Sequence, residues 1–469
     1  MSKFNTTNKK SPTKTINQAG GVAYMHSAEM ELVVSVLTTF LEDKHYESGD
    51  DRMKRIEELC AITRDTFIGK LAVMARNEFN LRSVSHLLLK TLARKHRGDN
   101  LVSKVMKKIV ERPDDLTEIT ALLGKPFPKQ VKKGIREALL RFNGYQLAKY
   151  KMENKGVKLV DLFNIAHPNP KFASTEQRES WKKLLANELK NKKTWEAKLS
   201  ATKGENKGKV WKEMVAEKEL GYMALLRNLR NISEECDKET IEKAAAKIAD
   251  RDEVKKSKQL PFRFYNAYEN VSNRTLLDAI SQALDYSLDN VPVLGGKTLI
   301  SVDGSGSMDG DPLKKASIFA AALYRATDSD MIVFSENYKE VKAAGNTPVI
   351  ELMQKIKHAA PGGGTRTSLT FEYAARSGAK YDRIVILSDN ESWQDSTWGG
   401  EGTNAAYNQY KKINDCYVYA FDLAGYGTKD VTGSKVFHLA GWSERIFDFM
   451  SFVERGEGLV DYVNSISLE

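Results

Sequence analysis

Apolar residues recur every three or four positions through the first part of the chain, from about residue 27 to residue 290. This spacing places them along one side of a helix, so it predicts a series of amphipathic helices of about three to four turns. The segments end at Gly, Asp, Asn or Pro, which are common helix stops. A long series of short helices indicates a solenoid of stacked helix pairs of the HEAT type, although no repeat length is regular enough to prove it.

The pattern changes after Pro292, where short apolar runs rich in β-branched residues alternate with helix-length segments. The runs are KTLISVD, SDMIVFS, YDRIVILSD and CYVYAFDL. This alternation predicts a Rossmann-like α/β domain, a parallel sheet with helices on both faces, whose functional loops follow the strands. We therefore expect a multidomain protein with a flexible tail over 1–18, an all-α helical-repeat domain over 19–290 and an α/β domain over 291–469.

Composition limits the class of protein. With 41% hydrophobic residues the chain can form sizeable cores, which excludes global disorder. Its sequence holds no apolar stretch long enough to span a membrane, and the polar, basic beginning lacks the apolar core of a secretory signal. Three widely spaced cysteines fit neither a disulfide scaffold nor a zinc ribbon. We expect a cytoplasmic protein, monomeric and not bound to a membrane.

The net charge of +10 is unevenly distributed. Residues 1–290 hold 54 Lys and Arg against 39 Asp and Glu, a net of +15, whereas residues 291–469 hold 18 against 23, a net of −5. The helical part can therefore attract a polyanion and the α/β part cannot easily do so. Many basic helical domains are merely soluble, so charge alone favours nucleic acid only weakly.

The strongest local signal is SVDGSGSMDG at 301–310, directly after the first predicted strand of the α/β domain. Asp303, Ser305 and Ser307 alternate on this turn, PGGGTRTSL supplies Thr365, and LSDNESW supplies Asp389 after the strand RIVIL. Two carboxylates with three hydroxyls suit Mg²⁺ or another hard divalent cation. The set resembles the metal-ion-dependent adhesion site of von Willebrand factor A domains, D-x-S-x-S followed by T and D. That resemblance implies an open coordination position for the carboxylate of a partner.

Two other interpretations of these loops remain. Each loop alone could be an ordinary turn, and the glycines at 362–364 could bind a phosphate, although no G-x-x-x-x-G-K-[ST] motif is present. Asp303 and Asp389 could also act as a general acid and base. However, His358 and His438 lie in no recognisable triad motif, and we expect binding and not enzymatic activity.

Several segments of the helical part, taken together, resemble the Ro60 or TROVE-domain family of RNA-binding proteins. The resemblance implies a ring of HEAT-like repeats closed by the von Willebrand factor A domain. It also implies that small non-coding, Y-like RNAs bind the outer basic surface, that single-stranded ends of misfolded RNA enter a central hole, and that the protein is a ribonucleoprotein scaffold in RNA quality control. The segments are NQAGGVAYMHS (17–27), KYKMENKGVKLVDLFNIAHPNP (149–170), TWEAKLS (194–200), GYMALLRNLRNI (221–232) and LPFRFYNAYENV (260–271).

Within this resemblance His167 occupies the position of a family histidine that contacts Y RNA, while a histidine that caps a helix or packs beside Pro168 is an equally good interpretation. The family often has an arginine near Glu153, which this chain lacks, so tight binding of Y RNA is less expected. For Arg227 and Arg230, contacts between helices compete equally with an RNA role, and Arg263 reads as structural. The predicted phosphate-binding residues form two groups, Lys149, Lys151, Lys155 and Lys158 around the histidine, and Lys129, Lys132, Lys133, Arg136 and Arg141 on a second basic helix.

An alternative function is a Mg²⁺-dependent protein-interaction module whose basic helices are only a scaffold. Its partner, a nuclease or another protein, would offer an acidic residue to the metal. Replacing Asp303 with alanine separates the alternatives, because it should remove capture of the partner and leave RNA affinity nearly unchanged.

Overall fold

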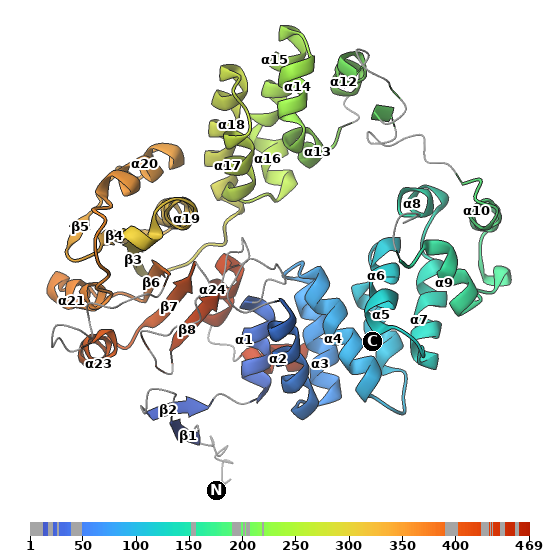
Figure 1. The fold of residues 1–469 in the computed structure, drawn as a ribbon, viewed down its shortest axis with the longest axis horizontal. Coiled ribbons are helices and arrows are strands. Elements are labelled where there is room, and N and C mark those ends of the chain that lie inside the picture. The colour runs from blue at the N-terminus through green and yellow to red at the C-terminus, as the bar shows by residue number, and fades with distance from the viewer. Residues whose placement is uncertain are drawn as a thin grey trace, which may run out of the picture.

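Helices build the first part of the chain and a six-stranded sheet with covering helices builds the second, as the sequence predicts (Figure 1). The computed structural model describes residues 13–16, 22–25, 28–38, 49–151, 156–189, 198–199, 202, 207–217, 220–389, 402–423, 431, 433, 435–440, 446–454 and 459–469. Within the described residues no helix is both long and apolar enough to cross a membrane. The cytoplasmic location stays a prediction.

The N-terminal helices stack as repeats. α3 packs on α5, α4 on α6 and α5 on α7, so that each helix contacts the second one after it, as in helix-pair solenoids. Gly134 permits the close approach of α7 to α5, since a Cβ at this position would overlap the sulfur of Met106. The helices are α1 (Ala28–Thr38), α2 (Gly49–Ile62), α3 (Asp65–Asn77), α4 (Arg82–Lys95), α5 (Leu101–Ile109), α6 (Pro113–Leu123), α7 (Lys129–Leu139), α8 (Gly144–Lys149), α9 (Leu159–Ala166) and α10 (Thr175–Leu185).

A second helical group follows and leads into the sheet. α17 packs on α18 and on α13, and α15 also packs on α18. Pro261 is the first residue of α17, where its missing N–H costs no hydrogen bond. The helices are α12 (Lys207–Ala216), α13 (Tyr222–Arg227), α14 (Leu229–Glu235), α15 (Lys238–Ile248), α16 (Arg251–Ser257), α17 (Pro261–Glu269) and α18 (Arg274–Tyr286).

The sheet has the strand order β5-β4-β3-β6-β7-β8, parallel except for the edge strand β5. The four predicted strands are present, and β5 and β8 were not predicted. The strands are β3 (Lys297–Asp303), β4 (Asp328–Phe334), β5 (Tyr338–Glu340), β6 (Arg383–Ser388), β7 (Tyr417–Asp422) and β8 (Val436–Ala440). The helices are α19 (Asp311–Ala326), α20 (Val349–Ala359), α21 (Ser368–Ser377), α23 (Thr403–Ile413), α24 (Ile446–Glu454) and α25 (Leu459–Ser465).

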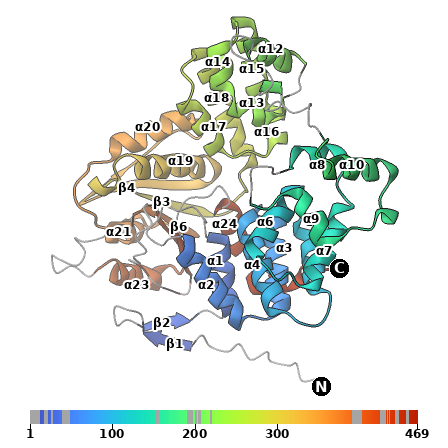
Figure 2. The same cartoon turned by 45° about the vertical axis from the view of Figure 1, so that its right-hand side comes forward.

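Different helices cover the two faces of the sheet (Figure 2). On one face Ile300 and Val302 of β3 belong to the same core as Phe319 of α19 and Phe447 of α24, and this core continues into the helical domain. On the other face Leu299 packs in a separate core with residues of α21 and α23. The alternation along β3 therefore places helices on both faces, as expected for a doubly wound domain.

The α/β domain contacts both ends of the helical series (Figure 1). α19 and α20 pack on α17 and α18, and α25 packs on α1 and α3. At the second contact the Tyr462 hydroxyl donates to Glu78 Oε2 at 2.9 Å, and the ring centroids of Phe79 and Phe452 lie 6.3 Å apart. The predicted closure of the helical series by the α/β domain is confirmed.

A short antiparallel hairpin precedes α1. It pairs β1 (Thr13–Ile16) with β2 (Val22–Met25). β1 lies within residues 1–18, which the polar sequence pattern predicts to be a flexible tail. The backbone there forms a strand because β2 offers it hydrogen-bonding partners, which the composition of the segment alone does not indicate.

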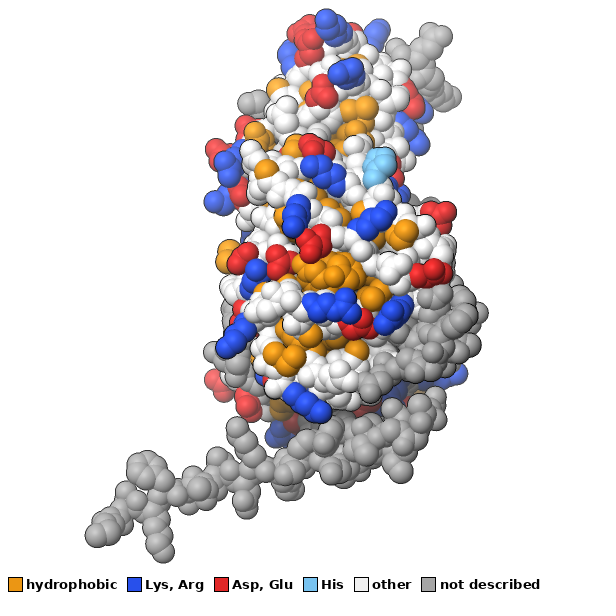
Figure 3. Space-filling view, turned by 90° about the vertical axis from the view of Figure 1, so that its left-hand side faces the viewer, with side chains coloured by type: hydrophobic (Ala, Val, Ile, Leu, Met, Phe, Trp, Pro, Cys, Tyr) orange, Lys and Arg blue, Asp and Glu red, His pale blue; other side chains and the backbone are white. Residues whose placement is uncertain are grey.

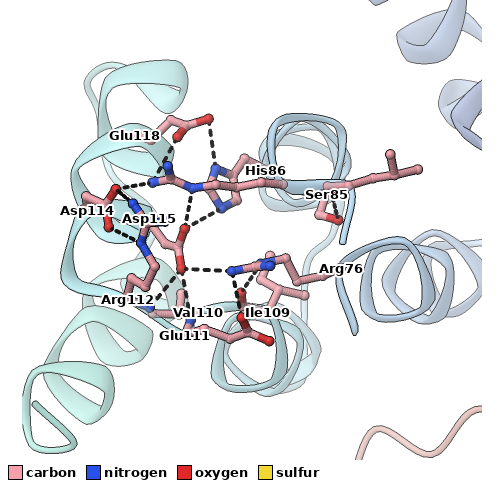
Figure 4. A network of polar contacts seen from close by, with 12 residues as sticks. Arg76, Ser85, His86, Ile109, Val110, Glu111, Arg112, Asp114, Asp115 and Glu118 are labelled. Carbon is pink, nitrogen blue, oxygen red and sulfur yellow. Dashed lines mark hydrogen bonds and ion pairs between the residues drawn. The ribbon is translucent and has the colours of Figure 1, made fainter. Parts of the chain in front are cut away.

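A buried network of charged side chains joins α3, α4 and α6 (Figure 4). Asp115, at the start of α6, is fully buried and accepts the backbone N–H groups of Glu111 and Arg112, each at 2.9 Å. Arg82 Nε donates to Asp115 Oδ1 at 2.5 Å. Burial raises the pKa of Asp115, but these hydrogen bonds and the Arg82 charge outweigh it, and the pKa is lowered. Part of the positive charge of the helical domain is thus neutralised internally.

Candidate functional site

Asp303 and Asp389 lie at the point where the strand order of the sheet reverses. Asp303 is the last residue of β3, and Asp389 directly follows the neighbouring β6. Because Val302 pairs with Leu387, both carboxylates reach the same edge of the sheet. Loops at such a reversal form the usual ligand crevice of open α/β sheets. The structure therefore brings together the two predicted acidic ligands.

Backbone hydrogen bonds join the first two predicted loops. Gly362 N donates to Gly304 O and Gly306 N donates to Gly363 O, both at 3.0 Å. The segment that carries Thr365 is therefore fixed against the turn that carries Asp303. Glu336, in the loop after β4, accepts the Gly364 N–H at 3.3 Å. The sequence analysis missed Glu336, although its position directly after a predicted strand could have indicated it.

Gly304 is required by space. A Cβ at this residue would lie 2.8 Å from Val333 Cγ1 and 2.9 Å from Ala360 Cα. Both distances are shorter than real Cβ contacts, and the second neighbour is backbone, which cannot rotate away. The glycine in the predicted D-x-S-x-S turn thus allows the turn to lie against β4 and the end of α20.

Asp303 is fully buried and hydrogen-bonded on both oxygens. Oδ1 accepts the Ser305 N–H at 2.9 Å, and Oδ2 accepts the Ser388 hydroxyl at 2.6 Å. Burial raises the pKa of Asp303 to about 6, the hydrogen bonds from Ser305 and Ser388 oppose this shift, and the Asp389 charge adds to it. Two buried carboxylates at one site repel each other, and a bound cation would relieve the repulsion.

The hydroxyl donors complete a set suited to a hard cation. Ser305 and Thr365 are buried, Ser307 is exposed, and the hydroxyl oxygens of Ser305 and Ser307 lie 3.3 Å apart. No cluster of three or more His, Cys, Asp or Glu that could hold a metal occurs in the described parts of the chain. The predicted site has only two carboxylates beside its three hydroxyls, and this set fits Mg²⁺ because the ion keeps several waters as ligands. The donor set thus fits the predicted cation.

The two histidines of the α/β domain bond to backbone. His358 Nδ1 lies 2.8 Å from Gln354 O, and His438 Nε2 lies 2.6 Å from Val431 O. The first contact lies within α20, and the second joins β8 to the segment that precedes it. Neither contact joins a histidine to a nucleophile.

The surface of the α/β domain carries both signs of charge. On the face shown in Figure 3, Lys and Arg side chains are interspersed with Asp and Glu. Arg366 pairs with Glu372 at 2.7 Å, and Lys355 pairs with Glu351 at 3.2 Å. On this face neither sign of charge forms an extended patch that would attract a polyanion.

α7 presents the basic surface that the sequence predicts. Lys129, Lys132 and Arg136 are exposed, while the opposite side of α7 packs against α5. We call these three residues the α7 basic face. Lys133 is half-buried and donates to Asn100 Oδ1 at 3.3 Å, so it serves the packing of the repeat as well.

Arg141 has a structural role that the sequence analysis did not foresee. Its guanidinium donates to Lys107 O at 3.1 Å and to Val110 O at 2.7 Å, and so satisfies carbonyl groups at the C-terminal end of α5. Burial lowers the pKa of Arg141. These contacts hold the guanidinium on α5.

The residues predicted around His167 are spread over several elements. His167 ends α9 in the left-handed conformation, with φ 48°, and its side chain is exposed. Lys151 Nζ donates to Asn187 Oδ1 at 3.3 Å, and Lys158 precedes α9, where its N–H donates to Asp161 Oδ2 at 2.8 Å. The ammonium of Lys149 lies 5.5 Å from the ring centroid of Tyr150, and Lys155 lies outside the described residues.

Comparison with known proteins identifies the family. The TROVE domain model matches residues 32–192 and 182–282, and the Ro60 vWA domain model matches residues 297–450. The crystal structure of the Deinococcus radiodurans RO (RSR) protein superimposes with a TM-score of 0.72 at 17% identity, covering 92% of this chain and 100% of that chain.

Two curated relatives match over part of the chain. Telomerase protein component 1 of Rattus norvegicus is 22% identical over 333 residues, and that of Mus musculus is 31% identical over 113 residues, which is 52% and 24% of this chain. The chain spans 12% and 4% of the length of these relatives. Because the TROVE model covers more than half of the chain and the Ro60 vWA model follows it, the protein belongs to the TROVE-domain family and carries a Ro60-type von Willebrand factor A domain.

Proposed function

We propose that this protein binds RNA through its helical part and acts as a ribonucleoprotein scaffold without catalysing a reaction. The α7 basic face, Lys129, Lys132 and Arg136, carries the proposal. It is exposed on a domain with a net charge of +15, while the α/β domain has a net charge of −5. Membership of the TROVE-domain family, and the names of the Ro and telomerase relatives, support RNA as the polyanion.

The ligand we propose for this face is a small structured RNA of the Y-like kind. Lysine and arginine side chains on one side of a helix contact phosphates of the backbone and read little sequence. Single-stranded ends of misfolded RNA would bind elsewhere on the helical part, and holding such RNA for a nuclease would be a role in quality control. At the α7 basic face, selectivity would come from the shape of the folded RNA.

The test compares two triple variants in the full chain. K129Q/K132Q/R136Q removes the α7 basic face, and K238Q/K243Q/K255Q removes three exposed lysines of α15 and α16 as the matched control. For a structured RNA, each lost phosphate contact reduces the slope of log K against log salt by about 0.9. We expect a reduction of about two to three for the first variant and much less for the control. An affinity of the wild type that barely changes between low and moderate salt would refute the proposal.

A second function rests on the loops at the sheet edge. We propose that Asp303, Ser305, Ser307, Thr365 and Asp389 hold Mg²⁺ or another divalent cation. When bound, the cation supplies an open position for a carboxylate oxygen of a protein partner. The buried carboxylates fix the position of the cation, and the exposed Ser307 marks the side that a partner can reach.

The cation site is tested with an adjacent control. D303N should abolish the rise in melting temperature that Mg²⁺ produces and the capture of a partner, with RNA affinity nearly unchanged. D309N removes an exposed carboxylate of the same segment and should keep both responses. Equal responses of D303N and the wild type to Mg²⁺ would contradict the assignment.

A further inference from the structure

α13, α14 and α17 surround a cavity of about 460 Å³ outside the sites described so far. This volume lies within the usual range of ligand pockets. Its polar lining consists of three arginines and three asparagines, and none of the described residues that line it is acidic. These residues, which we call the Arg–Asn pocket, are Arg227, Arg230, Asn231, Arg263, Asn266 and Asn270. The structure thus gathers Arg227 and Arg230, for which the sequence analysis gave helix contacts and an RNA role equal weight, and Arg263, which it predicted to be structural.

A buried amide fixes one wall of the pocket. Asn228 lies at the junction of α13 and α14, is buried, and its Nδ2 donates to Ala224 O at 2.7 Å. Asn231 Nδ2 in turn donates to Asn228 Oδ1 at 3.2 Å. This chain of amides links α13 to α14 across their junction, where Arg227 and Arg230 both line the pocket.

α17 supplies the opposite wall. Arg263, Asn266 and Asn270 stand three and four residues apart, so they project from one side of this helix. The other side of α17 is buried, with Phe262 stacked on Phe319 of the α/β domain at a centroid distance of 6.3 Å. Because α17 is held from behind, the polar side keeps its orientation toward the cavity.

The arginines that line the pocket favour an anionic ligand. Arg230 Nε lies 4.0 Å from Glu234 Oε1, but both side chains are more than 60% exposed, so this ion pair stabilises the site very little. Three guanidinium groups line one cavity, where their N–H groups can donate to an anionic ligand. Guanidinium groups bind phosphate through paired hydrogen bonds, and the amides can donate to further oxygens.

We propose that the Arg–Asn pocket binds a phosphate of single-stranded RNA, with an adjoining base against the apolar wall of Met223, Leu226 and Ala267. This inference rests on the proposed RNA-binding function and assigns one of its sites. In a duplex the bases are paired and stacked, so only an unpaired nucleotide presents both its phosphate and the face of its base. A peptide of acidic residues alone, such as oligoglutamate, would satisfy the arginines but would leave the apolar wall unused.

The experiment uses the full chain and three variants. R227Q/R230Q/R263Q removes the charges, R227K/R230K/R263K keeps the charges without the planar forks, and K238Q/K243Q/K255Q is the charge-matched control. Thermal unfolding confirms that each variant is folded. The probes are a labelled ten-nucleotide oligouridylate and a blunt RNA hairpin, measured by fluorescence anisotropy, with inorganic pyrophosphate and oligoglutamate in thermal shift assays.

We expect the glutamine variant to bind the oligouridylate about a hundredfold more weakly, since each lost hydrogen bond to a charged group weakens binding about tenfold and two arginines can reach one phosphate. The lysine variant should lie between the glutamine variant and the wild type. The control should change little, and hairpin binding should be kept by all three variants. Pyrophosphate should raise the melting temperature of the wild type and not that of the glutamine variant.

Three results would overturn the inference, and they separate it from the proposed function. Equal losses in the glutamine variant and the control, with the α7 basic face still needed for hairpin binding, would overturn the pocket and leave the proposed function standing. A wild type that binds neither RNA would overturn both. Stabilisation by oligoglutamate without binding of oligouridylate would assign the pocket to an acidic peptide instead.

Discussion

Replacing Asp115 with asparagine tests how much the buried charge network stabilises the helical domain. The side chain keeps its size but loses its charge in a fully buried position. Two backbone N–H groups at 2.9 Å then donate to a neutral oxygen, which costs about 1 kcal/mol each. Arg82 and Arg76 also lose their contacts with Asp115. Arg82 keeps Asp114 at 2.9 Å and Glu118 at 3.1 Å, and Arg76 keeps Glu111 at 2.9 Å, so the added loss is about 1 kcal/mol.

The expected total of about 3 kcal/mol lies at the lower end of the cost of breaking a buried ion pair. For a helical domain of this size it corresponds to a melting temperature lower by about 6–12 °C. Thermal unfolding followed by circular dichroism measures it. Glu111→Gln is the control, because Glu111 is half-exposed and pairs with Arg76 at 2.9 Å, and it should cost about 1 kcal/mol or less.

The pH dependence separates charge from shape. The folded-state pKa of Asp115 is lowered, so its stabilisation is present above the ordinary aspartate pKa of about 3.9 and is lost as the pH falls through the folded-state value. The difference in stability between the wild type and D115N should therefore shrink below about pH 4. A difference that stays constant from pH 7 to pH 3, or equal effects of D115N and E111Q, would refute the reasoning.

Three further predictions concern other sites. Gly304→Ala should destabilise the α/β domain by about 1–3 kcal/mol, because its methyl group overlaps neighbouring atoms, and should abolish the thermal shift with Mg²⁺. Burial lowers the pKa of His96, but the carboxylate of Asp65 at 2.8 Å helps to raise it above its ordinary value. The protonated imidazole therefore stabilises the fold at low pH, and this stabilisation is lost as the pH rises through the folded-state pKa. The stability difference between the wild type and His96→Gln should be larger at pH 5.5 than at pH 9. Tyr462→Phe removes the hydrogen bond to Glu78 and should increase hydrogen exchange in α25 with a cost of about 1 kcal/mol or less, whereas unchanged exchange would contradict a role in closure.

The sequence correctly places Asp303 and Asp389 at the same end of the sheet because their signal is local. Asp303 and Asp389 each directly follow a buried strand, and parallel strands bring their carboxyl ends to one edge. The edge strand β5 escapes prediction, since Tyr338–Glu340 is too short and too polar to show an apolar run. Its place in the sheet depends on pairing with β4.

Contacts between repeats are much harder to predict. The periodicity of α7 correctly places Lys129 on the exposed side, but it cannot show that Arg141 reaches carbonyl groups 31 and 34 residues earlier. The periodicity also cannot show that His86 of α4 contacts Glu118 of α6, where Nδ1 and Oε1 lie 3.1 Å apart. Such contacts follow from the stacking geometry of the repeats. No spacing within one helix encodes them.

The contact of α25 with α1 and α3 has a consequence for the order of folding. Arg64 donates to the side chain of Asn464 at 3.3 Å, across 400 residues of chain. Helical repeats form from local contacts as they are synthesised, whereas this contact must wait for the last helix. At about 5–20 residues per second, roughly 20–80 s pass between the synthesis of the two residues. During that interval the surface of α1 and α3 that α25 later covers is open to solvent and to chaperones, so this end of the helical series closes only after α25 has been synthesised.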